Sequence, residues 1–430
     1  MNQLWPRIRE AAGKLLRTGF FSVFFSNVAC KVLVFIGGTI IVRVLSKSDY
    51  GTYSYVMNCM GMVSLLGDLG CSMATGQFCN ENHADIKRRN TFFSYGLSRG
   101  IAFSAVVALL LYLSPWYYPF RTEEAATLTR NLCLMPFLNT TNNFLLTNLR
   151  VRLENHLFGV INLFQTLIHY VAILPMSYWI GLRGAVYSNY VIAFLVLVFS
   201  LWASRKHLDF SWRWSTPLSP PEQKSFLKLA FASQLNSGMA QGLILLDVFL
   251  IGLIIGDDTV IASYKVASTV PAALAFIPAS IIAYIGPYFA RNNQDLNWVR
   301  QSYIKLLAVC AGGSLLISGA AILTASWTIP LVFGNQYTDA VPCFIVLMIG
   351  YFFHAGIQTP SQNIIYTQRK VRVNLIITFL SGGANCVLDT LWILNAGSIG
   401  AAWATTAVHM FSAALCFGYM CYYLRRRTPA

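Results

Sequence analysis

Long runs of apolar residues alternate with short polar segments from one end of the chain to the other. A helix needs about 20 apolar residues to cross the hydrocarbon core of a bilayer, and these runs are long enough. The pattern therefore predicts about twelve membrane-spanning helices and no sizeable domain outside the membrane. The predicted spans cover residues 19–43, 51–77, 92–113, 126–148, 157–180, 184–203, 226–254, 260–288, 301–324, 339–364, 373–394 and 399–423.

The composition agrees with a membrane protein. Of the 430 residues 56% are hydrophobic and 11% are charged, whereas soluble domains carry roughly 25% charged residues. The ten cysteines are scattered singly and form no Cys-x-x-Cys pair, which fits packing residues better than a disulfide framework or a metal site. We expect an all-α polytopic membrane protein without a metal centre.

The formal net charge of +15 follows the predicted topology, so it does not indicate nucleic-acid binding. Of the 31 Lys and Arg residues, 23 fall on the side of the membrane that holds both chain ends, and four fall in the loops on the other side. Cytoplasmic loops of membrane proteins are enriched in Lys and Arg. Both termini are therefore predicted to be cytoplasmic.

The longest polar connection separates the sixth and seventh spans and is rich in Pro and Ser. It divides the spans into two sets of six. We predict an N-terminal lobe over residues 1–203, a cytoplasmic linker over 204–224 and a C-terminal lobe over 225–430.

Three stretches of the first predicted lobe resemble stretches of the second, in the same order. They are SKSDYGTYSY (46–55) with DDTVIASYKV (257–266), NFLLTNLRVR (143–152) with NIIYTQRKVR (363–372), and GLRGAV (181–186) with GSIGAA (397–402). Chance similarity between segments of biased composition is the alternative explanation. With an even number of spans in each repeat, the halves are parallel, as in transporters whose substrate site lies between two repeats.

Two of the predicted spans contain more than one proline. Pro271, Pro278 and Pro287 fall in the eighth span, and Pro342 and Pro360 fall in the tenth. A proline inside a spanning helix kinks it and frees backbone carbonyls. Each kink is either a hinge at which the helix bends during transport or a fixed bend required for helix packing.

Few charged side chains fall inside the predicted spans, and these are the candidate functional residues. In the first span Asn27 and Lys31 lie four residues apart, and in the third Tyr95 and Arg99 have the same spacing. Residues with this spacing share one face of a helix. Because a charge in lipid is costly, we expect Lys31 and Arg99 to face a protein interior or a water-filled cavity.

Carboxylates within the spans are fewer than cations. Asp68 lies in the second span, Asp247 in the seventh and Asp389 in the eleventh. One interpretation pairs Lys31 with Asp68 and Lys265 with Asp247, because buried charges in membranes commonly pair. Lys265 also lies close enough to the outer surface for its ammonium group to reach water.

Asp68 cannot neutralise both Lys31 and Arg99, so the first lobe is predicted to carry surplus positive charge. Such charge suits an anionic substrate such as a phosphate or diphosphate. No GxxxxGK[ST], HExxH or GxSxG motif occurs, and we expect a transporter with no catalytic residues. The predicted substrate-binding cations are Lys31, Arg99 and Lys265, and the predicted cavity polar or ion-coupling residues are Asn27, Asp68 and Asp247.

Several motifs recur in an order typical of one family. The first hairpin, RVLSKSDYGTYSYVMNCMGMVSLLGDLG (43–70), has an acidic residue before Tyr-Gly-x-Tyr and a span that ends in Asp-x-Gly. Later stretches are DVFLIGLIIG (247–256), LVFGNQYTDAV (331–341) and GSIGAAWATT (397–406). In these motifs the chain resembles the polysaccharide transporter family, which includes the O-antigen-unit flippases.

The resemblance implies a fold shared with MATE-type multidrug extruders and MurJ-type lipid II flippases, with two six-helix lobes around a central cavity. It also implies transfer of an undecaprenyl-diphosphate-linked oligosaccharide from the cytoplasmic to the periplasmic leaflet, driven by a gradient of protons or sodium ions. The cavity of such proteins is cationic, and Lys31, Arg99 and Lys265 fall in spans that supply cations to it.

We therefore expect a flippase of the bacterial inner membrane in O-antigen and lipopolysaccharide biosynthesis. The alternative is a multidrug extruder of the same superfamily. Expected partners are the lipid-linked glycan, the bilayer, and the polymerase and chain-length regulator of the pathway, with no nucleic acid. No cofactor is expected beyond a coupling proton or sodium ion.

Overall fold

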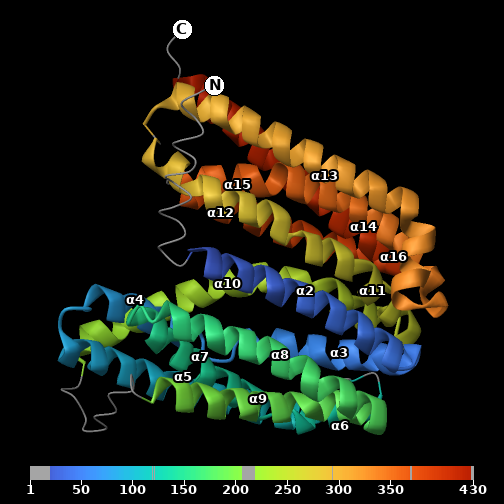
Figure 1. Cartoon of the computed structure of the whole chain (residues 1–430), viewed down its shortest axis with the longest axis horizontal. Helices are drawn as coiled ribbons and strands as arrows, with labels where there is room; N and C mark the ends of the chain where they lie inside the picture. Colours follow the sequence, from blue (N-terminus) through green and yellow to red (C-terminus); the bar gives the residue numbers. More distant parts are fainter. Residues whose placement is uncertain are drawn as a thin grey trace. The chain divides into compact units, whose positions relative to one another are not determined.

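The computed structural model describes residues 20–118, 120, 122–205, 218–292, 294–368 and 370–427. Every regular element in these ranges is a helix, so the predicted all-α class is confirmed (Figure 1). Seven of the described helices are long and apolar enough to cross a membrane. Residues 206–217 of the predicted linker and the basic segment before Phe20 lie outside the described residues.

The described residues pack as two compact units. Unit 1 consists of Met1–Val44, Gly67–Leu110 and Leu132–Ser233, and unit 2 consists of Leu45–Leu66, Leu111–Asn131 and Gln234–Ala430. Two segments of the predicted N-terminal lobe therefore pack within unit 2. The lobe boundaries at residues 203 and 225 stay a prediction.

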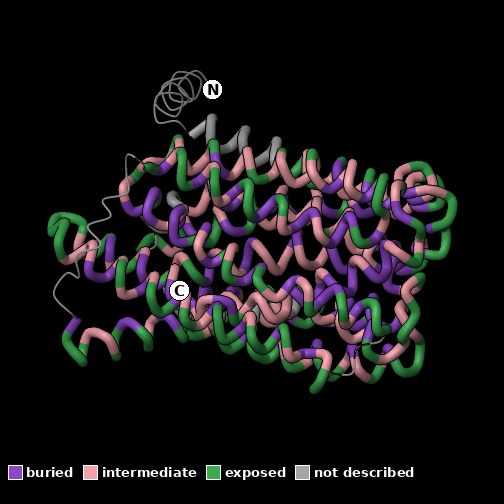
Figure 2. Tube along the Cα trace, turned by 90° about the horizontal axis from the view of Figure 1, so that it is seen from below, coloured by how far each residue is buried: buried purple, intermediate pink, exposed green. Residues whose placement is uncertain are grey.

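Unit 1 is built around helices that bury one face. Its core includes a cluster of aromatic side chains in which Phe78 stacks on Phe92 and Phe226. Buried and exposed residues alternate along single helices (Figure 2), as expected for one-sided burial. Its helices are α2 (Phe20–Val44), α4 (Cys71–Glu81), α7 (Met135–Val151), α8 (Asn155–Ile180) and α9 (Leu182–Ser204), with most of α5 (Ile86–Tyr117) and the start of α10 (Pro220–Ile254).

Unit 2 contains the remaining helices and the end of α10. Phe289, Tyr303, Ile364 and Met420 belong to an apolar cluster in its core. The helices are α3 (Lys47–Ser64), α6 (Glu123–Asn131), α11 (Asp258–Leu274), α12 (Phe276–Arg291), α13 (Leu296–Phe333), η1 (Asn335–Ala340), α14 (Val341–Phe353), η2 (His354–Gln358), α15 (Thr359–Thr367) and α16 (Val371–Arg427). Helix α16 bends at Gly397 into two helices, which correspond to the last two predicted spans.

The predicted span 51–77 is not one helix. Helix α3 ends at Ser64, and α4 begins at Cys71 after a turn in which Leu69 and Gly70 have φ angles of 47° and 79°. The Asp68 carboxylate accepts hydrogen bonds from the backbone N–H groups of Gly70 (3.0 Å) and Ser72 (2.9 Å). Asp68 therefore stabilises the start of α4, as a helix-capping carboxylate does.

Two further predicted spans are broken near prolines. Span 126–148 is divided into α6 and α7, and Pro136 lies in the first turn of α7. Span 260–288 is divided between α11, which ends at Leu274, and α12, which begins at Phe276 and has Pro278 in its first turn, four residues after Leu274. A proline cannot donate the backbone hydrogen bond that continues a helix, so these breaks have a local cause.

Predicted span 339–364 contains a π-helical turn, η2, directly before α15. Pro360 lies in the first turn of α15 and has no N–H to complete an α-helical ladder through the preceding turn. The wider π-turn accommodates the missing donor.

The local structure agrees with two of the three repeat pairs. Gly181 (φ 66°, ψ −142°) and Gly397 (φ 63°, ψ −143°) have the same conformation, which only glycine adopts readily. Ser46 and Asp257 are both N-caps and accept backbone hydrogen bonds at the starts of α3 and α11. In the pair formed by 143–152 and 363–372 the helices end at different points, α7 at Val151 and α15 at Thr367.

Candidate functional site

Two buried carboxylates meet inside unit 2. Asp247 of α10 is 9% exposed, Asp389 of α16 is fully buried, and the two carboxyl groups interact directly. Asp247 Oδ2 accepts hydrogen bonds from the Tyr264 hydroxyl (2.5 Å) and the Thr405 hydroxyl (2.7 Å). We define the carboxylate cluster as Asp247, Tyr264, Asn385, Asp389 and Thr405.

Neither carboxylate is fully satisfied by the described residues. Asn385 Nδ2 donates to Asp389 Oδ2 (2.6 Å), but the Oδ1 atoms of Asp247 and Asp389 have no hydrogen-bond partner in the described part of the chain. Two adjacent buried carboxylates cannot both stay ionised unless a positive charge joins them. The cluster can therefore hold one proton or one small monovalent cation between its oxygens.

Lys265 lies beside this cluster and does not form a close ion pair with it. It follows Tyr264 on α11, is partly buried, and Asp247 is the charged group that acts on it most. No described salt bridge joins Lys265 to Asp247 within 4.0 Å. Lys265 and Asp247 therefore lie near each other, but they do not form the ion pair that one interpretation of the sequence predicts.

Arg99 lies on α5 in unit 1 and is exposed. Its guanidinium carbon lies 5.3 Å from the ring centre of Tyr95, so the predicted spacing does bring the two side chains together. Asp68 lies in the same region as Arg99. Both residues are close enough to the Cys71 thiol to act on it electrostatically. Among the described residues Arg99 forms no salt bridge.

Lys31 lies on α2 in unit 1 and is exposed, as are Val32 and Val34. The described residues offer it no salt-bridge partner, and the pairing with Asp68 is not formed, because Asp68 caps α4. The side chain of Asn27 lies outside the described residues. Its predicted role as a cavity polar or ion-coupling residue therefore stays a prediction.

The structure assembles groups that the sequence analysis did not combine. The sequence predicts Asp389 only as an acidic residue within a span, and it predicts no role for Tyr264, Asn385 or Thr405. The spacing of Asn385 and Asp389, four residues apart in an apolar span, was the available signal. A second group joins His354 and His409, whose ring centres are 4.6 Å apart and whose Nδ1 atoms lie 3.3 Å and 3.0 Å from Gln358 Oε1.

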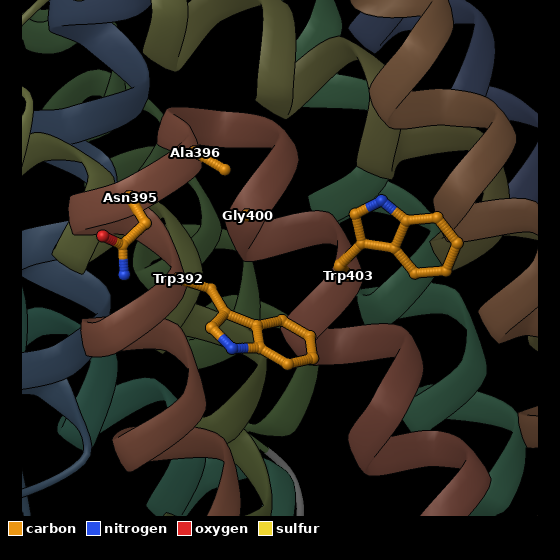
Figure 3. Close-up of a pocket in the computed structure, with 5 residues that line it drawn as sticks. All are labelled: Trp392, Asn395, Ala396, Gly400 and Trp403. Atoms are coloured by element: carbon orange, nitrogen blue, oxygen red, sulfur yellow. The ribbon is translucent and has the colours of Figure 1, made fainter.

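An apolar pocket of about 290 Å³ lies at the bend of α16. Figure 3 shows the rings of Trp392 and Trp403 beside Asn395, Ala396 and Gly400. None of these lining residues is charged, so the pocket does not suit a diphosphate. It lies apart in sequence from every predicted site residue.

Comparison with known proteins identifies a family. A family model described as "Polysaccharide biosynthesis protein" matches residues 40–342. No curated protein matches the chain.

Several solved membrane proteins have the same fold. A structure of the lipid II flippase MurJ in an inward closed conformation has a TM-score of 0.77 and 14% identity, covering 93% of this chain and 87% of its own. An inward-facing MATE multidrug transporter of the MOP superfamily has a TM-score of 0.73 and 14% identity, with 93% and 96% covered. An outward-facing MATE multidrug transporter of the MOP superfamily has a TM-score of 0.62 and 13% identity, covering 94% of this chain and 97% of its own. The chain is therefore a multi-pass membrane protein with the MurJ and MATE fold, and it belongs to the polysaccharide biosynthesis protein family.

Proposed function

We propose that this protein is a flippase for a lipid-linked glycan. Its substrate is an undecaprenyl-diphosphate-linked O-antigen or related repeat unit, moved from the cytoplasmic to the periplasmic leaflet of the bacterial inner membrane by alternating access. The family and the likeness in fold to a lipid II flippase support the transport of a lipid-linked substrate. The cytoplasmic position of both termini is part of the same proposal.

The observation that carries the substrate proposal is that Arg99 forms no salt bridge with any described residue. Arg99 lies inside a helix that is long and apolar enough to span the membrane, and it is exposed. The Asp68 carboxylate accepts hydrogen bonds from two backbone N–H groups at the start of α4. An exposed guanidinium at this depth can bind a diphosphate by charge-assisted hydrogen bonds, and Lys31 of the same unit would add a second cation.

The carboxylate cluster supplies the proposed energy coupling. Asp247 and Asp389 need a shared positive charge, and a proton or sodium ion that enters the cluster provides it. Lys265 is then a cation that adjusts the net charge of this cluster, and it does not serve as a ligand for the substrate.

Replacing Arg99 by Gln is expected to lower glycan display on the cell surface about tenfold at equal protein abundance. A charge-assisted hydrogen bond contributes about 1.5–3 kcal/mol, which corresponds to at least this factor. The double variant with Lys31→Gln is expected to lower display further. Display is measured in cells that lack the native chain and carry each variant.

Arg130→Gln is the matched control. The Arg130 guanidinium carbon also lies over an aromatic ring, 5.2 Å from the centre of Tyr112, but Arg130 is at the margin of its predicted span. Display in this control is expected to stay native. Full display in the Arg99 and Lys31 double variant would refute the binding role.

A multidrug extruder is retained as a second candidate, because an extruder coupled to cations needs buried carboxylates and the structure contains such a pair. Ethidium efflux from cells that express the chain separates the two functions. A glycan flippase is expected to produce no efflux above that of cells without the chain.

A further inference from the structure

A charged contact joins three elements of unit 2 at the start of α3. Lys47 Nζ lies 2.7 Å and 2.8 Å from the two carboxylate oxygens of Asp339 in η1. The Ser263 hydroxyl of α11 donates to Asp339 Oδ2 at 2.8 Å. We call these three residues, Lys47, Ser263 and Asp339, the latch.

Close packing supports the latch along α3. A Cβ atom on Gly51 would lie 1.9 Å from the carbonyl oxygen of Asp258, at the start of α11. A Cβ atom on Gly252 would lie within 2.5 Å of the Tyr55 ring. Glycine at these two positions therefore allows α3 to lie directly against α10 and α11.

The latch can open without a large cost in free energy. The Lys47 and Asp339 side chains are 20% and 55% exposed, so water can replace their contact. A turn from Leu65 to Gly70 follows α3 directly and separates it from α4. Because the two helices are not continuous, α3 can move while α4 stays in place.

Helix α11 connects the latch to the carboxylate cluster through two consecutive residues. Ser263 donates to Asp339 of the latch, and Tyr264 donates to Asp247 of the cluster. Both side chains are buried, at 5% and 1% exposure, so neither can rotate freely into solvent. A shift of α11 that changes the Tyr264 contact therefore changes the Ser263 contact as well, because one turn of helix moves as a unit.

We propose that the latch is the conformational switch that responds to the coupling cation, with Ser263 and Tyr264 as the positioning residues that transmit the response. This proposal rests on the proposed role of the carboxylate cluster in coupling. A cation bound between the Oδ1 atoms of Asp247 and Asp389, which have no described partner, draws the Asp247 carboxylate toward Asp389 and away from the Tyr264 hydroxyl, which donates to its Oδ2 atom. Tyr264 then leaves its position, α11 shifts, Ser263 loses Asp339, and the contact between Lys47 and Asp339 opens.

Modification of a cysteine at position 54 measures this opening. Ser54 of α3 is 5% exposed, so a Ser54→Cys thiol reacts with a maleimide only when α3 moves away. The full chain is purified in detergent, and labelling is measured with and without NaCl at constant pH, and at two pH values without sodium. Rates are divided by those of the denatured protein at each pH, and the chain without the new cysteine gives the background.

One of the two cations is expected to raise the labelling rate at least threefold. In the Ser54→Cys background, Ser263→Ala is expected to reduce this response to less than half. Ser268→Ala is the matched control, because the Ser268 hydroxyl donates to the Lys265 carbonyl of its own helix and does not touch the latch. Lys47→Gln, a second variant independent of α11, is expected to label rapidly without either cation.

Three results would overturn all or part of the proposal, and they differ in meaning. A labelling rate that neither cation changes, while Asp389→Asn abolishes transport, removes the latch as the responding element but leaves the cluster as the coupling site. Full transport by Asp389→Asn removes the coupling site and the switch together. A response that Ser263→Ala leaves intact, in protein that elutes as a single species, excludes Ser263 as the transmitting residue.

Discussion

Replacing Asp389 by Asn is expected to reduce glycan display to about a hundredth of the native level, which corresponds to about 2.7 kcal/mol. Asn keeps the size of the side chain and its contact with Asn385, but it removes one of the two charges that hold the cation. Asp247→Asn is expected to have the same effect. The double variant is expected to be no worse than either single variant, because two residues that hold one cation act as a unit.

The measurement compares surface glycan in cells that carry each variant at matched protein abundance. Glu123→Gln, which neutralises an exposed carboxylate of α6, is the control and is expected to display native amounts. Native display by the Asp389 variant would show that transport does not use a cation in the carboxylate cluster.

Replacing Gly400 by Val is expected to prevent accumulation of the folded protein. A Cβ atom at this position would lie 2.0 Å from the carbonyl oxygen of Trp392, and backbone cannot move aside as a flexible side chain can. The bend of α16 at Gly397 would have to open, with a loss of stability that exceeds roughly 3 kcal/mol. The measurements are the amount of full-length protein in the membrane fraction and the temperature at which it unfolds in detergent.

Gly383→Val is the matched control in the same helix, because no atom lies within 4 Å of its Cβ position. Gly184→Val should fail as Gly400→Val does, since its Cβ atom would lie 1.9 Å from the carbonyl oxygen of Met176 in the equivalent position of the first repeat. Normal accumulation of the Gly400 variant would show that the tight approach of the two helices is not required.

The helical class could be predicted from the sequence because runs of apolar residues report directly on membrane-spanning helices. The break in predicted span 51–77 could not, because Leu65 and Leu66 continue the apolar run and the turn depends on positive φ angles at Leu69 and Gly70. The glycines of the third repeat pair were predictable as a pair, and their shared conformation gives the physical reason for the match.

The cations of the predicted site stood out because each interrupts an apolar run. Their environment was less predictable, since the local cap that engages Asp68 depends on the turn before α4. The carboxylate cluster joins α10, α11 and both parts of α16. Sequence spacing on one helix finds Asn385 with Asp389, but only tertiary packing brings Asp247, Tyr264 and Thr405 to them.

The π-turn at His354–Gln358 has a consequence for aligning this chain with others. Such a turn holds one residue more than an α-helical turn, so residues after it are rotated by about 100° relative to an uninterrupted helix. A homologue with a regular helix here would match this chain only across a one-residue gap. An alignment that closes the gap would assign every residue of α15 to the wrong face.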